Sequence, residues 1–359
     1  MDVVDGLVGA TVLTQVSAAI SGVPAPVQRT FFQAIHRLCL SAVEWPAAAL
    51  EGKAAEIRAV SAARASLTEM IGTKLAGSAS VDPVAVQAAV DVHTKKILGR
   101  QFNVDAVVRD AVLELVNNVD SQPSGDGQAG EAPHAIKDDW LDYFEREAEM
   151  ASSDDLRLAF GKILAGECRR PGSFSKSTLR VLSQLSQETA NSFQLFCNLA
   201  TQFWPTDGSV PDVRVWDLGK DVGTNELKDY GINYPMILDL MEAGLVSTSL
   251  TSSIQYGVFA RTSDNTLMGT IKYANRLWGL LPWPQNVERN SEIAITEFGG
   301  PSLTRVGREL SNVVTVIEDV EYTSALKYHL AELSIARAEV RWDSAGQRYA
   351  QRIDPFDGK

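Results

Sequence analysis

The stretch from Asp138 to Phe203 carries the strongest structural signals in this sequence, because helix caps, helix stops and apolar periodicity agree along it. Its pattern predicts four consecutive short helices. Asp138 and Asp139 precede Trp140, where a carboxylate can accept hydrogen bonds from first-turn amides and interact with the positive end of the helix dipole. Short helices joined by tight turns must pack compactly. We therefore expect a helical bundle over residues 137–204.

The second helix of this bundle is predicted to begin at a capping box. Ser152 and Asp155 have the spacing at which a hydroxyl accepts a third-position amide and the carboxylate accepts the amide of the cap residue. An apolar stripe with helical spacing follows, made of Leu156, Phe160, Ile163 and Leu164. Gly161 lies beside that stripe, so we expect another backbone to approach closely there.

Turn and cap residues separate the remaining helices of the bundle. Pro171 and Gly172 predict a stop, since proline disfavours helix at the preceding residue and glycine adopts positive φ without penalty. Ser175 is placed to start the third helix and Ser186 to cap the fourth.

Four segments of this bundle resemble a bacterial family catalogued as a domain of unknown function, numbered twenty-eight zero six. The segments are DDWLDYF, SSDDLRLAFGKILAGE, PGSFSKSTL and LSQLSQETANSF. The family pattern corresponds here to Asp139-Trp140, Leu164–Glu167, Pro171–Ser175 and Leu185-Ser186. Phe160 departs from the pattern, which would place tryptophan there. The resemblance implies neither an activity nor catalytic residues, and it associates the chain with related helical proteins found among phage-defence genes.

Composition narrows the classes of function. The formal net charge is −12, from 45 acidic and 33 basic residues, and this charge opposes general binding to a nucleic-acid phosphate backbone. The cysteines at 39, 168 and 197 have no CxxC spacing, so we expect reduced thiols and a cytoplasmic location. We expect no cofactor.

The run from Val3 to Val23 is the most membrane-like part of the sequence. It lacks the basic region of a signal peptide, and its threonine, serine and glutamine residues make it more polar than a spanning segment of about 20 apolar residues. A buried or interface helix is the favoured interpretation, and contact with a membrane is the alternative.

The chain divides by composition into five parts. Residues 1–119 form a predicted helical N-terminal domain, and residues 120–136, rich in Ser, Gly, Pro and Asp, form a predicted flexible linker. The helical bundle at 137–204 comes next. A smaller α+β domain is predicted over 205–343, and a frayed tail over 344–359. The predicted fold class is thus mainly α.

The predicted α+β domain contains a helix, a Gly-Leu-Val step at Gly244, several strands and a Leu-Thr-x-x-Gly-x-x-Leu segment. This order is similar to the end of many winged-helix domains. Thr304 would cap the last of these helices, and Gly307 would permit close packing. A final helix is predicted over residues 321–341.

No pattern in the sequence indicates catalysis with any specificity. Pro211-Asp212 followed by Glu226-Leu227-Lys228 superficially matches a metal-dependent nuclease, but that chemistry needs the Glu and Lys on a strand, whereas this segment is predicted to open a helix. The four histidines lack metal-ligand spacing. The acidic cluster Asp138, Asp139, Asp142 and Glu145 is better explained by helix capping and a solvated face than by a cation site.

The segment NRLWGLLPWP is the candidate interaction surface. It concentrates large apolar side chains in a stretch predicted to be a loop, and its candidate residues are Trp278, Trp283, Leu280 and Leu281. Tryptophan is enriched where binding energy concentrates. The alternative is a loop folded back on the core, since tryptophan usually buries most of its area.

The sequence therefore predicts a non-catalytic interaction or sensing component of a bacterial system, with antiviral defence as the process that the resemblance suggests. A protein partner or self-association is expected. One alternative is a membrane-acting defence effector that uses residues 3–23. The second alternative is a metal-dependent nuclease.

Overall fold

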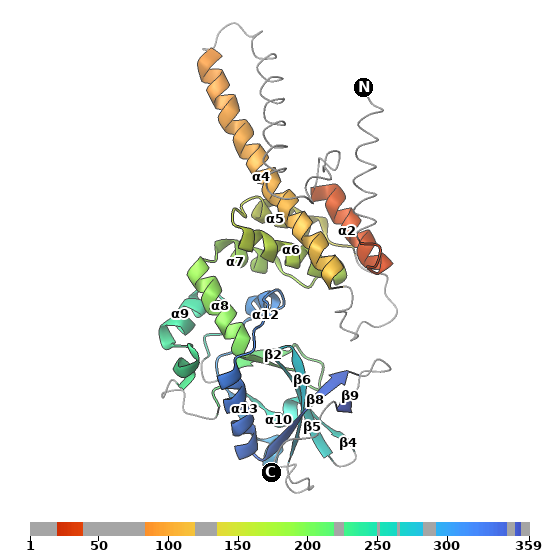
Figure 1. Ribbon diagram of the computed structural model, residues 1–359, viewed down its shortest axis with the longest axis vertical. Helices are drawn as coiled ribbons and strands as arrows, with labels where there is room; N and C mark the ends of the chain where they lie inside the picture. Colours follow the sequence, from red (N-terminus) through yellow and green to blue (C-terminus); the bar gives the residue numbers. More distant parts are fainter. Residues whose placement is uncertain are drawn as a thin grey trace. The chain divides into compact units, whose positions relative to one another are not determined.

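A computed structural model describes residues 20–38, 83–118, 135–218, 226–249, 252–263, 266–282, 292–342 and 349–352 (Figure 1). The chain separates into two compact units. The first comprises residues 1–122 and 130–183, and the second comprises residues 123–129 and 184–359. Most of the predicted linker at 120–136 and of the membrane-like run at 3–23 lies outside the described residues.

The first unit consists of helices joined by turns over its described residues. Helix α4 is the longest element, and it packs along α6, while α2 contacts both α5 and α6. The helices are α2 (Ala25–Leu38), α4 (Pro83–Asn117), α5 (Asp138–Ala148), α6 (Asp154–Arg169) and α7 (Lys176–Gln184), the last of which reaches the boundary with the second unit.

Cap residues determine where these helices start. Asp138 and Asp139 occupy the first turn of α5, as predicted. The capping-box prediction was wrong by one residue, because Ser153 rather than Ser152 takes the extended cap conformation. The hydroxyl of Ser153 accepts the N–H of Leu156 at 3.2 Å.

The core of the first unit forms around the predicted apolar stripe of α6. Phe160, Ile163 and Leu164 are fully buried, and the ring of Phe144 meets that of Phe160 edge-on with centroids 5.7 Å apart. Gly161 allows α4 to approach as expected, since a Cβ at this position would lie 2.8 Å from the Cβ of Asp110.

The motifs that carry the family resemblance meet at one loop of this unit. The buried carboxylate of Glu167 accepts the N–H groups of Gly172 at 2.5 Å and Phe174 at 3.0 Å. The indole N–H of Trp140 donates to the Phe174 carbonyl at 2.7 Å. A side chain at Gly166 would collide with the Phe174 ring, at 2.7 Å from its Cβ. These motif residues therefore hold the Pro-Gly-Ser-Phe-Ser link in place.

The second unit is built on an antiparallel sheet (Figure 1). Seven strands form the sheet in the order β2-β1-β5-β6-β8-β9, with β4 also paired to β5, and a separate two-stranded sheet joins β3 to β7. The strands are β1 (Ala200–Phe203), β2 (Asp212–Val215), β3 (Ser253–Gln255), β4 (Ala260–Ser263), β5 (Thr266–Tyr273), β6 (Arg276–Pro282), β7 (Glu297–Gly299), β8 (Ile335–Trp342) and β9 (Tyr349–Arg352).

Helices accompany the sheet of the second unit. They are α8 (Gln187–Leu199), η3 (Glu226–Tyr230, a 3-10 helix), α9 (Tyr234–Glu242), α10 (Tyr256–Phe259), α12 (Arg305–Ser311) and α13 (Val320–Glu332). Ser186 caps α8 as predicted and accepts the N–H of Thr189 at 3.0 Å. An aromatic core forms around Phe298, whose ring lies 4.1 Å from that of Trp216 and 6.0 Å from that of Phe203 between centroids.

The fold is α+β, so the prediction of a mainly α chain was wrong. The four helices predicted as one central bundle also separate, since α5, α6 and α7 belong to the first unit and α8 belongs to the second. The sheet was underestimated because several of its strands are short or buried on both faces, and such strands lack a clear alternation of apolar and polar residues.

The winged-helix prediction for residues 205–343 was also wrong. Its local contacts are present: Thr304 caps α12, Val246 bridges to Leu303, and a Cβ at Gly307 would lie 2.1 Å from the Leu245 carbonyl oxygen. Of the strands between these segments, β3 and β7 form the separate two-stranded sheet, whereas β4, β5 and β6 join the seven-stranded sheet, which a winged-helix domain does not have.

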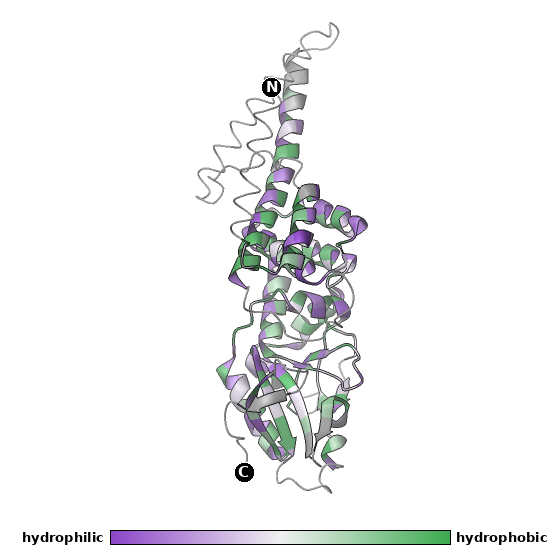
Figure 2. Cartoon of the chain, turned by 90° about the vertical axis from the view of Figure 1, so that its right-hand side faces the viewer, coloured by the Kyte–Doolittle hydropathy of each residue, from purple (hydrophilic) through white to green (hydrophobic). Residues whose placement is uncertain are grey.

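Hydropathy along the described part of the chain is mixed, with apolar and polar residues alternating over most elements (Figure 2). No helix within the described residues is both long enough and apolar enough to cross a membrane.

Candidate functional site

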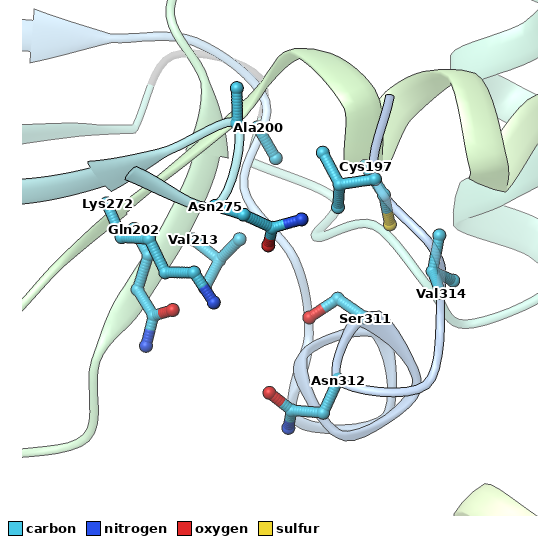
Figure 3. Close-up of a pocket in the computed structure, with 11 residues that line it drawn as sticks. Cys197, Ala200, Gln202, Val213, Lys272, Asn275, Ser311, Asn312 and Val314 are labelled. Atoms are coloured by element: carbon cyan, nitrogen blue, oxygen red, sulfur yellow. The ribbon is translucent and has the colours of Figure 1, made fainter. Parts of the chain in front are cut away.

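A small cavity in the second unit is the candidate functional site (Figure 3). Its volume is about 130 Å³. The walls come from the end of α8, from β1, β2 and β5, from the turn that joins β5 to β6, and from the end of α12 with the segment after it. Its polar side chains are Gln202, Lys272, Asn275, Ser311 and Asn312. We call this cavity the α12 pocket.

The sheet register brings two of these polar side chains together. Gln202 of β1 lies directly opposite Lys272 of β5 in the antiparallel ladder. Residues opposite one another in a ladder direct their side chains to the same face of the sheet. Figure 3 shows Lys272 and Gln202 on the strand side of the pocket, with Ser311 and Asn312 across from them.

A tight turn places Asn275 at the pocket. Tyr273 pairs with Arg276 across the hairpin, so the connection between β5 and β6 has only two residues, Ala274 and Asn275. Both have positive φ, at 46° and 61°. Such a turn requires left-handed backbone at both positions and favours Asn, Asp or Gly there. Alanine at the first position is therefore strained, and strained backbone is often found at functional sites.

The end of α12 forms the opposite wall. Ser311 is the last residue of this helix and Asn312 is its C-cap. The hydroxyl of Ser311 donates to the carbonyl of Arg308 at 2.8 Å, and the Asn312 amide donates to the same carbonyl at 3.1 Å. These bonds hold both side chains in fixed positions beside the cavity.

The electrostatics of the pocket differ from those of the chain as a whole. The chain carries a net charge of −12, yet the pocket lining includes one lysine and no carboxylate. Within the described residues, no hydrogen bond or ion pair engages the side chains of Gln202, Lys272 and Asn275. Partial burial lowers the pKa of the Lys272 ammonium, because desolvation disfavours the charged form.

Cys197 also lines the pocket, but it is not an activated nucleophile. Its side chain is buried, and burial raises the pKa of its thiol above the ordinary value. The thiolate is the reactive form of cysteine. Cys197 therefore contributes a small apolar surface to the wall, as buried cysteine usually does.

The residues predicted as an interaction surface are placed elsewhere. Trp278, Leu280 and Leu281 lie in β6 between β5 and β8, and all three are buried. The loop prediction for this segment was wrong over residues 276–282, which form a strand. Trp283, the fourth predicted residue, lies outside the described residues. The guanidinium of Arg337 lies over the Trp278 ring, 4.9 Å from its centroid.

The residues of the nuclease pattern do not assemble into a metal site. The carboxylate of Asp212 accepts two hydrogen bonds from Arg214, at 2.6 and 2.9 Å. Glu226 and Lys228 belong to the 3-10 helix η3, as the helical prediction for that segment implied, and not to a strand. Across the described residues, no group of three or more His, Cys, Asp or Glu side chains could hold a metal ion.

The acidic cluster at the start of α5 has structural partners. Arg37 of α2 pairs with Asp142 and lies 3.8 Å from Asp138, and Lys176 pairs with Asp139 at 2.7 Å. The Lys176 ammonium lowers the pKa of the Asp139 carboxyl through this hydrogen bond. The cluster thus connects α5 to α2 and α7.

Fold and site together define an α+β protein in which a helical unit is followed by an antiparallel-sheet unit that contains a small polar pocket. A family model described as "Protein of unknown function (DUF2806)" matches residues 93–327, which is more than half of the chain. The chain belongs to this family. No curated protein and no solved structure matches it.

Proposed function

We propose that this protein is a non-catalytic sensing component that binds a small molecule in the α12 pocket. One observation carries the proposal: the side chains of Gln202, Lys272 and Asn275 line the cavity without a partner among the described residues. Lys272 and Asn275 are exposed and Gln202 is half-buried, so these groups can bind a ligand without breaking a hydrogen bond within the described part of the protein.

The position of the pocket supports a sensing role. A ligand there would contact β1, the β5–β6 turn and the end of α12, which are distant in sequence. A ligand that binds only the folded protein stabilises it by RT ln(1 + [L]/Kd), or about 2.7 kcal/mol when its concentration is 100 times Kd. Occupancy of the α12 pocket would therefore change the stability of the second unit.

The proposed output is a contact with a protein partner, which includes a second copy of the chain. We further propose that the system is antiviral defence. That part rests on the family resemblance, and plaque counts on cells with and without the gene test it. Equal plaque counts would remove defence from the proposal and leave ligand binding in place.

Thermal unfolding of the full chain tests ligand binding. We expect at least one compound in a panel of short carboxylates, inorganic phosphate, amino acids, nucleosides and polyols to raise the melting temperature in a dose-dependent way. Ser311→Leu should fill the pocket and abolish the effect. Ser324→Leu is the matched control, because Ser324 is also helical and its hydroxyl also donates to a backbone carbonyl, but it is exposed on α13. A panel with no stabilising compound, or stabilisation that survives Ser311→Leu, would contradict the proposal.

A further inference from the structure

The polar groups of the α12 pocket can donate hydrogen bonds to a ligand, and one of them, Lys272, can only donate. Lys272 supplies an ammonium with three donors and no acceptor, and the amides of Gln202 and Asn275 can each turn an NH₂ group toward a ligand. The Ser311 hydroxyl and the Asn312 amide each already donate to a backbone carbonyl. A ligand rich in acceptors fits this set, and a carboxylate carries acceptors only.

The charge of the pocket lining also favours an anionic ligand. Because no Asp or Glu lines the pocket, a cation bound there would face Lys272 without a compensating charge. An anion would instead complete an ion pair with a charge-assisted hydrogen bond, which is stronger than a bond between neutral groups. One lysine balances one negative charge, so a monoanion is compensated and a phosphate dianion is not.

Size and the apolar walls limit the rest of the ligand. The cavity measures about 130 Å³, somewhat smaller than an engineered cavity of about 150 Å³ that binds benzene. The pocket is partly open, and its interior holds about five or six non-hydrogen atoms of a ligand. Val213, Val314 and Val316 also line the pocket and can contact a short alkyl group.

We infer that the α12 pocket binds a small monocarboxylate, with the carboxylate at Lys272 and Asn275 and a short apolar chain against the valines. The inference rests on the proposed function, since it names the class of ligand that the sensor would detect. The inference also accounts for the strained turn, because the left-handed backbone at Ala274 and Asn275 places the Asn275 amide at the pocket.

Saturation-transfer NMR on the full chain tests this inference, with propionate as the probe and propionamide as its neutral counterpart of the same size. We expect saturable binding of propionate and at least about tenfold weaker binding of propionamide, the factor that corresponds to loss of one hydrogen bond to a charged group. Inorganic phosphate should compete poorly with propionate.

Two substitutions assign the binding to the pocket. Lys272→Met removes the ammonium and should weaken propionate binding at least about tenfold. Lys327→Met is the matched control, because Lys327 is exposed on α13 away from the pocket lining, and it should leave binding unchanged. Asn275→Gly keeps a residue suited to the left-handed turn and removes the amide, so it should weaken binding without unfolding the protein.

The outcomes separate the inference from the proposed function. Equal binding of propionate and propionamide, tighter binding of phosphate, or unchanged propionate binding in folded Lys272→Met would each overturn the monocarboxylate assignment. A neutral compound that binds in a manner sensitive to Ser311→Leu, together with no binding of propionate, would overturn the inference and leave the sensing proposal intact. Absence of binding by every panel compound would refute both.

Discussion

Replacing Glu167 with glutamine tests whether the family motifs hold the loop that follows α6. The Glu167 carboxylate is 3% exposed and accepts two backbone N–H groups, from Gly172 and Phe174. Glutamine keeps the shape and one acceptor oxygen, but its NH₂ group would face a backbone N–H. One charge-assisted hydrogen bond is then lost and a buried donor is left unsatisfied. We expect a loss of about 1.5 to 3 kcal/mol in the free energy of unfolding.

The expected change in melting temperature follows from the size of the unit. About 2 to 4 °C is lost per kcal/mol for a unit of about 150 to 250 residues, so Glu167→Gln should lower the first unit's transition by about 3 to 12 °C. Calorimetry measures this shift, and hydrogen exchange of the peptide that covers Gly172 to Phe174 should show faster exchange. The control is Asp155→Asn, an exposed acid in the first turn of α6, which should cost at most about 1 kcal/mol. Equal shifts for the two variants, with exchange unchanged, would refute the reasoning.

Three further predictions concern the packing of the core and the strain of one turn. Phe160→Ala removes a fully buried ring and should lower the free energy of unfolding in urea by about 3 to 5 kcal/mol. The control Asp142→Ala removes one partner of an exposed ion pair and should cost no more than about 1 kcal/mol. Equal costs would mean that the buried face of α6 is misassigned. Trp278→Ala should cost about 3 to 5 kcal/mol because the side chain is buried in β6, and unchanged stability with a lost partner contact would contradict that burial. Ala274→Gly should raise stability by about 0.5 to 1 kcal/mol, because alanine is strained at a φ of 46°, and a lower melting temperature would exclude this explanation.

The helices of the first unit could be predicted because two independent signals agree there. The apolar spacing from Phe160 to Leu164 sets the buried face of α6, and neighbouring serine and aspartate residues cap the helix. The cap depends on a local hydrogen bond and the buried face depends on the 3.6-residue repeat of apolar side chains, so both can be read from a short window of sequence. The error at Ser152 shows the limit of this reasoning, since two adjacent serines can both act as caps and only the backbone conformation selects one.

The strands of the second unit were harder to predict for two different reasons. β6 is buried along most of its length, so it appears as a continuous apolar run with a proline at its end, which also suits a loop. β8 did carry a signal, because Arg337, Glu339 and Arg341 alternate with small apolar residues. This alternation was missed because the segment was assigned to the final helix predicted over 321–341. In the structure α13 ends at Glu332, and Ser334 turns the chain with a φ of 55°.

The α12 pocket could not be predicted from local patterns at all. Its lining residues lie between positions 197 and 316, and the antiparallel register of β1 with β5 brings Gln202 beside Lys272. Register depends on pairing between distant segments, and no short motif encodes it. The turn at Ala274-Asn275 was the one local signal available, since a two-residue connection with asparagine suits a hairpin.

The family motifs and the pocket can be separated by their physical roles. Buried hydrogen bonds join Trp140, Glu167 and Phe174 to one another. These residues therefore have a structural role within the first unit. Lys272 and Asn275 of the α12 pocket have the opposite property, because neither side chain makes a hydrogen bond within the described residues that a ligand would need to replace. A ligand binds at the lowest free-energy cost where the donors of the protein make no internal hydrogen bond that must first be broken. Glu167→Gln should therefore reduce the folded population while the molecules that remain folded bind propionate with unchanged affinity. Lys272→Met should leave the folded population unchanged and weaken the binding of propionate.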